Sequence, residues 1–593
     1  MFNFIAGTIL FLLPFLLLGL FVDKRRGFVY IIFSILFFHV ALAFFTQLFG
    51  IFYYQVIFWA TLLADVLALA ILFKFRNKFS FKFSNIDWVA VLVVFVAVLT
   101  LYQVHYNYTG KASLVMDKPA LYHEVKNMQY PYPYFSDEWY AVSLIEGAIK
   151  FHSLPFHNLL DNGFFSNLEM FSHSFLAELT LLLDFDPLTQ YTVLSIIINT
   201  LIVILVYLFL RLADIPKKIS AIFALFVLYI TCGANLPGIQ HLIPVTLGIL
   251  FSLIGFCFIQ MRKTKMVLLS FFTVSLFYPL LSPFYILSVL IYLFSTVKKL
   301  KENKFKIIGY SALAIFLAVP LVLILLLISP AAWLVNLVFS KLYYFSFTGF
   351  FIPQYNIFYI VPWCVLVLAL AGFQVAFKKT PWLFWPLIIG ILYWISYFFT
   401  TYRFIIEFER AIYFTSIIIC ITAAFGFQKL KDYFISNFNK KANIILKLVE
   451  SAAIIAFVLF IPFYTSGENW KELVSINQQT KDMVYPRGLA NNYLTPDDLN
   501  IFKDIKGKKF LSIPWKGTVI GVATENYPAA TKGGTITLGP LDLTDNFIQG
   551  DCAKKTDMVK NLKLDYVYLL PFDCPGFEKI DQSSEGFVLY KVL

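Results

Sequence analysis

Charged residues are scarce in this sequence: Asp, Glu, Lys and Arg together make up 14% of its 593 residues. Hydrophobic residues make up 60%, and a soluble chain of that composition would aggregate. Apolar runs of about 20 residues, the length that crosses a bilayer core, recur along the chain. The sequence therefore predicts a polytopic α-helical membrane protein and excludes an ordinary soluble enzyme.

Cysteine is also scarce, with six residues and no CxxC pair. This spacing supports neither a zinc ribbon nor a dithiol redox motif. The net charge of +12 does not come from the tail, because residues 467–593 hold 15 basic and 16 acidic side chains. The excess lies in short clusters between apolar segments, which is the positive-inside pattern of a membrane protein. We expect no nucleic-acid partner.

The apolar segments predict about 14 spans of the bilayer. Lys24, Arg25 and Arg26 follow the first apolar segment, the reverse of a cleaved signal peptide, so we expect an uncleaved first span with its N-terminus outside. The predicted spans are 4–22, 28–46, 55–74, 88–105, 189–211, 218–233, 239–260, 266–281, 283–297, 306–329, 355–377, 382–400, 411–428 and 445–464. The expected location is the plasma membrane.

One long polar interval, 105–188, falls on the outer side once the basic segment 75–86 is placed inside. Within it, 168–184 is apolar, but a span there would put every later basic loop on the wrong side. We therefore predict an interfacial or re-entrant helix at 168–184. Its polar positions are Glu169, His173 and Glu178. This assignment divides the chain into N-terminal helices (1–87), a transmembrane core (88–465) and a tail (466–593).

The tail has soluble composition and is predicted to be a small α/β domain outside the membrane. Thr495, followed by Pro496 and two aspartates, is typical of a helix start. The expected elements are helices at 494–505 and 554–562 and strands at 509–515, 566–572 and 586–592.

Two cysteines, Cys552 and Cys574, lie in this tail, where oxidation can occur. They bracket one predicted helix and one predicted strand, so the chain can return and bring them together. We predict a disulfide between them; the alternative is two unpaired thiols in a domain that is stable without a crosslink.

The strongest candidate for chemistry is the acidic pair Asp137-Glu138, which begins an amphipathic run in the outer interval. Transfer of a sugar to a hydroxyl needs a base near the acceptor. A carboxylate at the outer face can be that base, or it can hold a divalent metal such as Mg or Mn. The alternative is that both acids simply start a surface helix.

The stretch DEWYAVSLIEGAIKFHSLPFHN, followed by FSHSFLAELTLLLDFDPLTQY, resembles the first outer loop of GT-C superfamily glycosyltransferases. These include protein O-mannosyltransferases, aminoarabinose transferases and oligosaccharyltransferase-like proteins. The segment ERAIYFTSIIICITAAFGF resembles their late span. The resemblance covers about 88–465 and implies an inverting transfer from a polyprenyl-phosphate sugar to a lipid, glycan or protein acceptor. It places Asp137 at the acidic catalytic position, with Glu138 beside it.

This sequence departs from the GT-C pattern in three ways. It has three extra N-terminal spans, no obvious second Asp-x-Asp loop, and no WWDYG-like sequence of the oligosaccharyltransferases in its tail. The last departure puts asparagine-linked transfer in doubt.

A second candidate is YRFIIEFER, in which Arg403, Glu407 and Arg410 fall on one helical face. Arginine suits a phosphate because it stays charged and donates two parallel hydrogen bonds. This face predicts a clamp on the donor phosphate; a salt-bridged helix end is the alternative. His173 and His241 are further candidates for substrate contact. Five of the seven histidines lie in 105–188, but their spacing matches no standard metal motif.

Three other functions remain open: a transporter or flippase of lipid-linked saccharides, a polysaccharide polymerase or ligase, and a non-catalytic envelope protein that keeps only the GT-C fold. A transporter would place charges or broken helices at mid-membrane, whereas most charges here lie at the ends of predicted spans.

Overall fold

The structure is a computed structural model, and the figures follow its element labels. It describes residues 2–21, 26–74, 87–106, 108–115, 121–128, 132–133, 136–165, 167, 169–230, 241–300, 357–401, 406, 408–460, 489–490, 494–531, 538–540 and 542–593.

The chain forms two compact units, each assembled from separate parts of the sequence. The helical unit comprises Met1–Ala41, Phe58–His105 and Leu194–Arg487. The mixed unit comprises Leu42–Ile57, Tyr106–Val193 and Gly488–Leu593. The sequence-based divisions at 1–87, 88–465 and 466–593 follow chain order instead, and they stay predictions.

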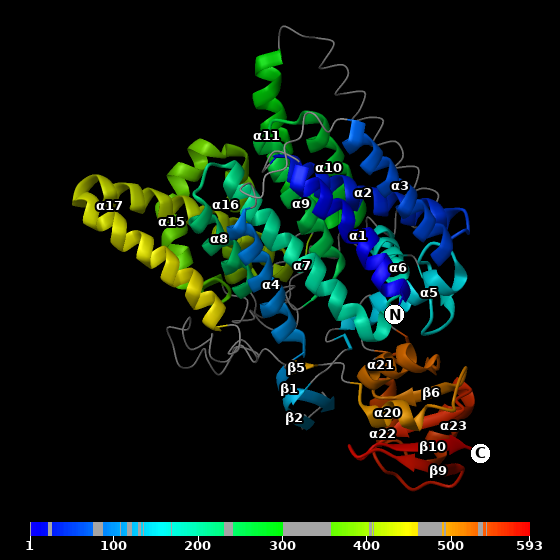
Figure 1. Cartoon of the computed structure of the whole chain (residues 1–593). Coiled ribbons are helices and arrows are strands. Elements are labelled where there is room, and N and C mark those ends of the chain that lie inside the picture. Colours follow the sequence, from blue (N-terminus) through cyan, green and yellow to red (C-terminus); the bar gives the residue numbers. More distant parts are fainter. Residues whose placement is uncertain are drawn as a thin grey trace. The chain divides into compact units, whose positions relative to one another are not determined.

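Apolar helices make up most of the described chain (Figure 1). They are α1 (Phe2–Phe21), α2 (Arg26–Leu48), α3 (Tyr54–Lys74), α4 (Trp88–Tyr106), α7 (Pro187–Leu212), α8 (Lys217–Phe226), α9 (Pro244–Gln260), α10 (Thr264–Phe277), α11 (Ser282–Leu300), α14 (Ile357–Ile360), α15 (Trp363–Lys379), α16 (Pro381–Thr400) and α17 (Phe408–Phe460).

Five of the described helices are long and apolar enough to cross a membrane, in keeping with a multi-pass membrane protein. They lie at Gly27–Leu48, Pro187–Leu212, Pro279–Thr296, Pro381–Thr400 and Phe408–Asn437. Several other predicted spans correspond to shorter apolar helices, at Asn3–Pro14, Tyr54–Ala70, Trp88–Gln103, Pro244–Gln260 and Thr264–Phe277. The predicted span at 218–233 is helix α8 of 10 residues followed by the 3₁₀ turn η3 (Val227–Tyr229). The predicted span at 306–329 lies outside the described residues.

Glycines allow the helices of the helical unit to approach each other closely. A Cβ on Gly372 of α15 would lie 2.4 Å from the Gly426 nitrogen and the Thr422 carbonyl oxygen of α17. A Cβ on Gly390 of α16 would lie 2.0 Å from the Thr415 hydroxyl of α17. Small residues at crossings are the usual means by which helices pack inside a bilayer.

Helix α17 is continuous over 53 residues, yet it turns back on itself. A straight α-helix would separate Lys431 from Glu450 by about 28 Å, because each residue rises 1.5 Å. The Lys431 ammonium instead lies 2.5 Å from the Glu450 carboxylate. Figure 1 shows the two arms. The two separate spans predicted at 411–428 and 445–464 thus correspond to the arms, and the predicted loop at 429–441 is helical.

The mixed unit contains two helices of the predicted outer interval, α5 (Ser136–Phe151) and α6 (Met170–Leu182). A short antiparallel pair, β3 (His157–Asn158) and β4 (Gly163–Phe164), lies between them in sequence. A further sheet pairs β1 (Tyr108–Val115) with β2 (Leu121–Met128) antiparallel, and β1 with β5 (Leu489–Ala490) parallel.

The C-terminal domain, residues 494–593 of the mixed unit, is built on a five-stranded sheet of order β7-β6-β8-β10-β9. Strand β6 is parallel to β7 and β8, and β10 is antiparallel to β8 and β9. The strands are β6 (Lys509–Ser512), β7 (Tyr527–Pro528), β8 (Tyr566–Leu569), β9 (Phe577–Gln582) and β10 (Val588–Val592). The helices are α20 (Pro496–Ile501), α21 (Pro514–Thr524), α22 (Leu543–Gln549) and α23 (Cys552–Leu562).

The predicted helix start at Thr495 is present. The Thr495 hydroxyl accepts a hydrogen bond from the Asp498 nitrogen at 3.1 Å, and the Asp498 carboxylate accepts one from the Thr495 nitrogen at 2.8 Å. This reciprocal capping box satisfies two donors that a helix end otherwise leaves unpaired. Buried Lys516 donates to Asp498 at 2.5 Å and to Glu585 at 2.9 Å, so its charge is paired inside the domain.

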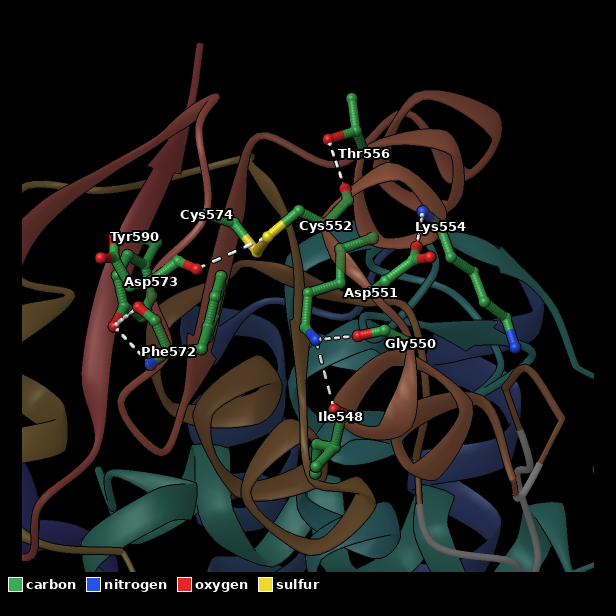
Figure 2. Close-up of a disulfide and its surroundings, with 11 residues drawn as sticks. Ile548, Gly550, Asp551, Cys552, Lys554, Thr556, Phe572, Asp573, Cys574 and Tyr590 are labelled. Atoms are coloured by element: carbon green, nitrogen blue, oxygen red, sulfur yellow. Dashed lines mark hydrogen bonds between the residues drawn. A yellow bond between two sulfur atoms is a disulfide. The ribbon is translucent and has the colours of Figure 1, made fainter.

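The predicted disulfide is also present in the structure. Cys552 and Cys574 are bonded, with Cα atoms 5.4 Å apart (Figure 2). Cys552 is the first residue of α23, and Cys574 lies in the turn between β8 and β9. The bond therefore ties a helix start to the edge of the sheet.

Candidate active site

Helix α5 begins with the acidic pair, because Ser136 is followed at once by Asp137 and Glu138 in its first turn. Carboxylates are favoured there by the positive end of the helix dipole. The next residues, Trp139 and Tyr140, are 0% and 1% exposed and anchor this end of the helix in the mixed unit. The predicted amphipathic helix is therefore formed, and its apolar face is packed inside the protein.

The two carboxylates of the pair differ in exposure. Glu138 is 2% exposed, whereas Asp137 is half-buried. The Asp137 charge acts on Tyr140 of the same helix, and both charges act on Tyr191 in the first turn of α7. Tyr132 stacks on Trp139 with ring centroids 6.4 Å apart. The more accessible carboxylate thus lies beside aromatic rings, while its neighbour is enclosed.

Glu146, two turns further along α5, lies in an acidic environment. Burial raises the pKa of its carboxyl to about 8, and the charges of Asp186 and Glu525 add to this shift while Lys150 opposes it. The Lys150 ammonium forms an ion pair with Glu525 at 3.2 Å. At neutral pH the Glu146 carboxyl is therefore mostly protonated.

The segment after α5 is fixed to that helix by side-chain hydrogen bonds. Ser143 donates to the Asn158 amide oxygen at 3.2 Å and accepts from the Leu159 nitrogen at 3.1 Å. A Cβ on Gly147 would lie 2.5 Å from the His157 carbonyl oxygen, so only glycine permits this approach. His152 bonds to the Phe52 carbonyl oxygen at 2.8 Å.

Helix α6 corrects the expectation of a polar face at Glu169, His173 and Glu178. His173 is 3% exposed and Glu178 is 0% exposed, because α6 packs within the unit on nearly all sides. Asn167 donates to the His173 Nδ1 at 3.1 Å and to the Pro155 carbonyl oxygen at 2.9 Å. Burial lowers the pKa of His173 to about 4, so the ring is neutral. Its substrate contact stays a prediction; what the structure shows is a buried link to the proline turn.

The arginine clamp is described only in part, since Arg403 and Glu407 lie outside the described residues. Arg410, in the first turn of α17, donates to the Tyr278 hydroxyl at 2.6 Å, with its guanidinium 5.5 Å from the ring centroid. Tyr278 is 0% exposed, so it gives Arg410 a fixed support. His241 is 6% exposed, and its carbonyl oxygen accepts from Thr246 at 3.4 Å.

A metal ion would need several donor side chains close together. Among the described residues, no group of three or more His, Cys, Asp or Glu side chains is placed to hold a metal ion. Mg²⁺ is commonly held by one or two carboxylates together with substrate phosphates. Asp137 as a metal ligand therefore stays a prediction, and no step of the mechanism below passes through a metal.

Sequence reasoning missed two partners of the acidic helix. Tyr191 and the C-terminal helix α21 both reach α5, but they come from sequence positions about 50 and 380 residues later. The only local signal was the Glu146–Lys150 pair at helical spacing, which marks the face that meets Glu525.

Comparisons with known proteins were made for the whole chain. No protein family model and no curated protein matches its sequence. Among solved structures, it is similar to the oligosaccharyltransferase of Archaeoglobus fulgidus in the apo form, at 13% identity and a TM-score of 0.44, over 81% of this chain and 69% of that one. The same enzyme tethered to an acceptor peptide gives 14% identity and a TM-score of 0.41, over 81% and 69%.

A third similar structure is the arabinofuranosyltransferase AftD from Mycobacteria, at 10% identity and a TM-score of 0.46, over 85% of this chain and 41% of that one. At these identities and TM-scores, the likenesses assign neither an activity nor a site residue to this chain. The functional reasoning therefore depends on the chain's own residues.

Proposed function

We propose that this protein is a membrane glycosyltransferase that moves a sugar from a polyprenyl-phosphate donor to an envelope acceptor at the outer face. The observation that carries the proposal is the acidic pair at the start of α5. Asp137 is half-buried at the positive end of a helix, next to aromatic rings, while Glu138 is enclosed. This arrangement suits one carboxylate that meets a substrate and a neighbour that shapes its surroundings.

In the proposed reaction Asp137 is the general base. Its carboxylate takes the proton of an acceptor hydroxyl as that oxygen bonds to the anomeric carbon of the donor sugar. The bond from the anomeric carbon to the phosphate oxygen breaks, and polyprenyl phosphate leaves with the electron pair. A single displacement of this kind inverts the anomeric centre.

Arg410 is the proposed contact for the donor phosphate. Its guanidinium is always charged, it donates to the Tyr278 hydroxyl, and its planar fork suits two phosphate oxygens. In the predicted topology Asp137 and Arg410 share the outer side. Arg403 and Glu407 belong to the same proposal.

The test is transfer from a panel of polyprenyl-phosphate sugars to envelope fractions. Asp137→Asn should lower turnover by about 100-fold or more, because it removes the base and keeps the size. Glu138→Gln should be milder and serves as the matched control. Both variants must elute as the wild type does in size-exclusion chromatography. Unchanged turnover in Asp137→Asn would remove this residue from the mechanism.

The alternatives predict different results in the same experiment. A flippase would move the lipid-linked sugar across vesicles without transferring it. A non-catalytic envelope protein would do neither, with any donor in the panel.

A further inference from the structure

Tyr140 connects the acidic helix to the C-terminal domain. It lies one helical turn after Asp137 on α5 and is 1% exposed. Its hydroxyl is hydrogen-bonded to Thr531 and Thr518, which are themselves 1% and 0% exposed. Burial raises the pKa of the Tyr140 phenol to about 12, so it keeps its proton and acts as a hydrogen-bond donor and acceptor at once.

Both threonine hydroxyls that meet Tyr140 have a further partner within the C-terminal domain. The Leu538 nitrogen donates to the Thr531 hydroxyl at 2.9 Å, and the Thr518 hydroxyl donates to the Pro514 carbonyl oxygen at 3.0 Å. Tyr140 therefore links a hydroxyl of α21 to a hydroxyl of the segment after β7, and the contact depends on all three side chains.

Helix α21 presents one face to the segment that holds the acidic pair. Thr518 and Gly521 lie three residues apart on one side of that helix, and Glu525 caps its C-terminal end. Thr518 bonds to Tyr140, and Glu525 pairs with Lys150 at 3.2 Å. A Cβ on Gly521 would lie 2.8 Å from Leu160 Cδ2, so the glycine permits a close approach between them. Three different kinds of contact thus lie along about two turns of α21.

We propose that the C-terminal domain is a positioning element of the candidate active site, and that Tyr140 is the residue through which it orients Asp137 and Glu138. This inference rests on the proposed function for its catalytic part. Without α21 and Thr531, the Tyr140 hydroxyl would lose these partners, and α5 would lose a contact in its second turn as well as the Lys150 ion pair in its last turn. Leaving a buried polar group unpaired favours rearrangement, because such groups are costly.

The experiment compares hydrogen exchange and kinetics in the full-length protein. Tyr140→Phe and Thr531→Val should speed amide exchange in α5 by about tenfold, since each breaks the chain of hydroxyls. They should lower kcat by about 10- to 100-fold while KM changes by less than about twofold, because the substrate still binds but meets a misplaced base. Thr531→Ser keeps the hydroxyl and should restore both values.

The matched control is Tyr590→Phe. It also removes a hydroxyl with two bonds in the C-terminal domain, in this case to the Phe572 nitrogen and carbonyl oxygen at 2.9 and 2.8 Å. It should leave α5 exchange and kcat unchanged. An equal effect of Tyr590→Phe and Tyr140→Phe would mean general destabilisation and would overturn the inference.

A second pair of variants tests the ion pair without touching the buried hydroxyls. Lys150→Glu should speed exchange in α5, and the double variant Lys150→Glu with Glu525→Lys should restore it. Unchanged α5 exchange in Tyr140→Phe would exclude the positioning role, even if the wild type transfers sugar. If Tyr140→Phe speeds α5 exchange but the wild type transfers no sugar, the docking contact is retained and the proposed function is excluded.

Discussion

Glu146 makes the stability of the protein depend on pH through one side chain. Its pKa is raised from 4.5 to about 8, so between these values the folded protein holds a proton that the unfolded chain releases. The contribution of Glu146 to the free energy of unfolding should therefore fall as pH rises through this window and level off above it. We expect a lower thermal unfolding temperature at pH 8.5 than at pH 5.5 in detergent.

The matched variant is Glu146→Gln, which keeps the shape and cannot ionise. Its unfolding temperature should change less between the two pH values than that of the wild type. Equal changes in both proteins would assign the pH dependence to other groups.

Replacing Arg410 with lysine changes the shape of the side chain at constant charge, and the apparent KM for the donor should report the difference. If it holds the donor phosphate, Arg410→Lys should raise the apparent KM by about tenfold, because a lysine cannot reproduce the planar fork of donors. Tyr278→Phe removes the hydroxyl that supports the guanidinium and should raise KM to a smaller extent. An unchanged KM in Arg410→Lys would favour a structural role at the helix end.

At the residue scale, the predictable features were those with local signals. Thr495 and its capping box follow from adjacent residues, and the Cys552–Cys574 pair was limited to two cysteines in one polar tail. The burial of His173 and the raised pKa of Glu146 depend on neighbours that periodicity does not reveal. An apolar helix with three polar residues reads as amphipathic until the residues packed on its polar side are known.

The disulfide should stabilise mainly the C-terminal domain, in which both cysteines lie. A loop of 22 residues crosslinked in the unfolded state contributes roughly 3 kcal/mol in the loop-entropy view. The double variant Cys552→Ser with Cys574→Ser should lower the unfolding temperature of the C-terminal domain. Faster hydrogen exchange of amides in that domain is the measurement that checks this. Cys364→Ser, which removes a cysteine outside that domain, is the control. Equal exchange in both variants would show that the crosslink is dispensable.

At the element scale, the tail was predicted well where strands are apolar. Predicted strands at 509–515, 566–572 and 586–592 correspond to β6, β8 and β10. Helix α21 was missed because its sequence, PWKGTVIGVAT, combines two glycines with β-branched residues of low helix propensity. Tertiary packing of its glycine face overrides that preference. Strand β9 was missed because five of its six residues are exposed and most are polar.

Thiol labelling in intact cells tests the predicted orientation of the whole chain in the membrane. In the predicted topology the basic segment 75–86 is inside, and the C-terminal domain is outside. Ser80→Cys should resist a membrane-impermeant thiol reagent in intact cells, whereas Ser584→Cys should react. Labelling at position 80 from outside would overturn the arrangement.

One ion pair and one hydrogen bond join residues that the predicted topology places on the same side. Lys217 pairs with Asp87 at 3.1 Å, and both begin helices that are expected to start inside. Arg410 bonds to Tyr278, and both are expected outside. The class of the molecule follows from composition, but its two compact units do not, since each joins segments hundreds of residues apart. Hydrophobic periodicity reports single helices and carries no information on which of them share a unit.

The contact between Gly372 and Gly426 has a consequence for assembly in the membrane. Apolar helices gain little by leaving lipid for each other, so α15 is held to α17 mainly by close packing at this crossing. During synthesis α15 is made before α17, so Gly372 meets its partner only when a segment about 50 residues later in the chain has been inserted. A bulkier residue at either position would leave α15 inserted in the membrane but unable to pack closely on α17, which is a defect of assembly.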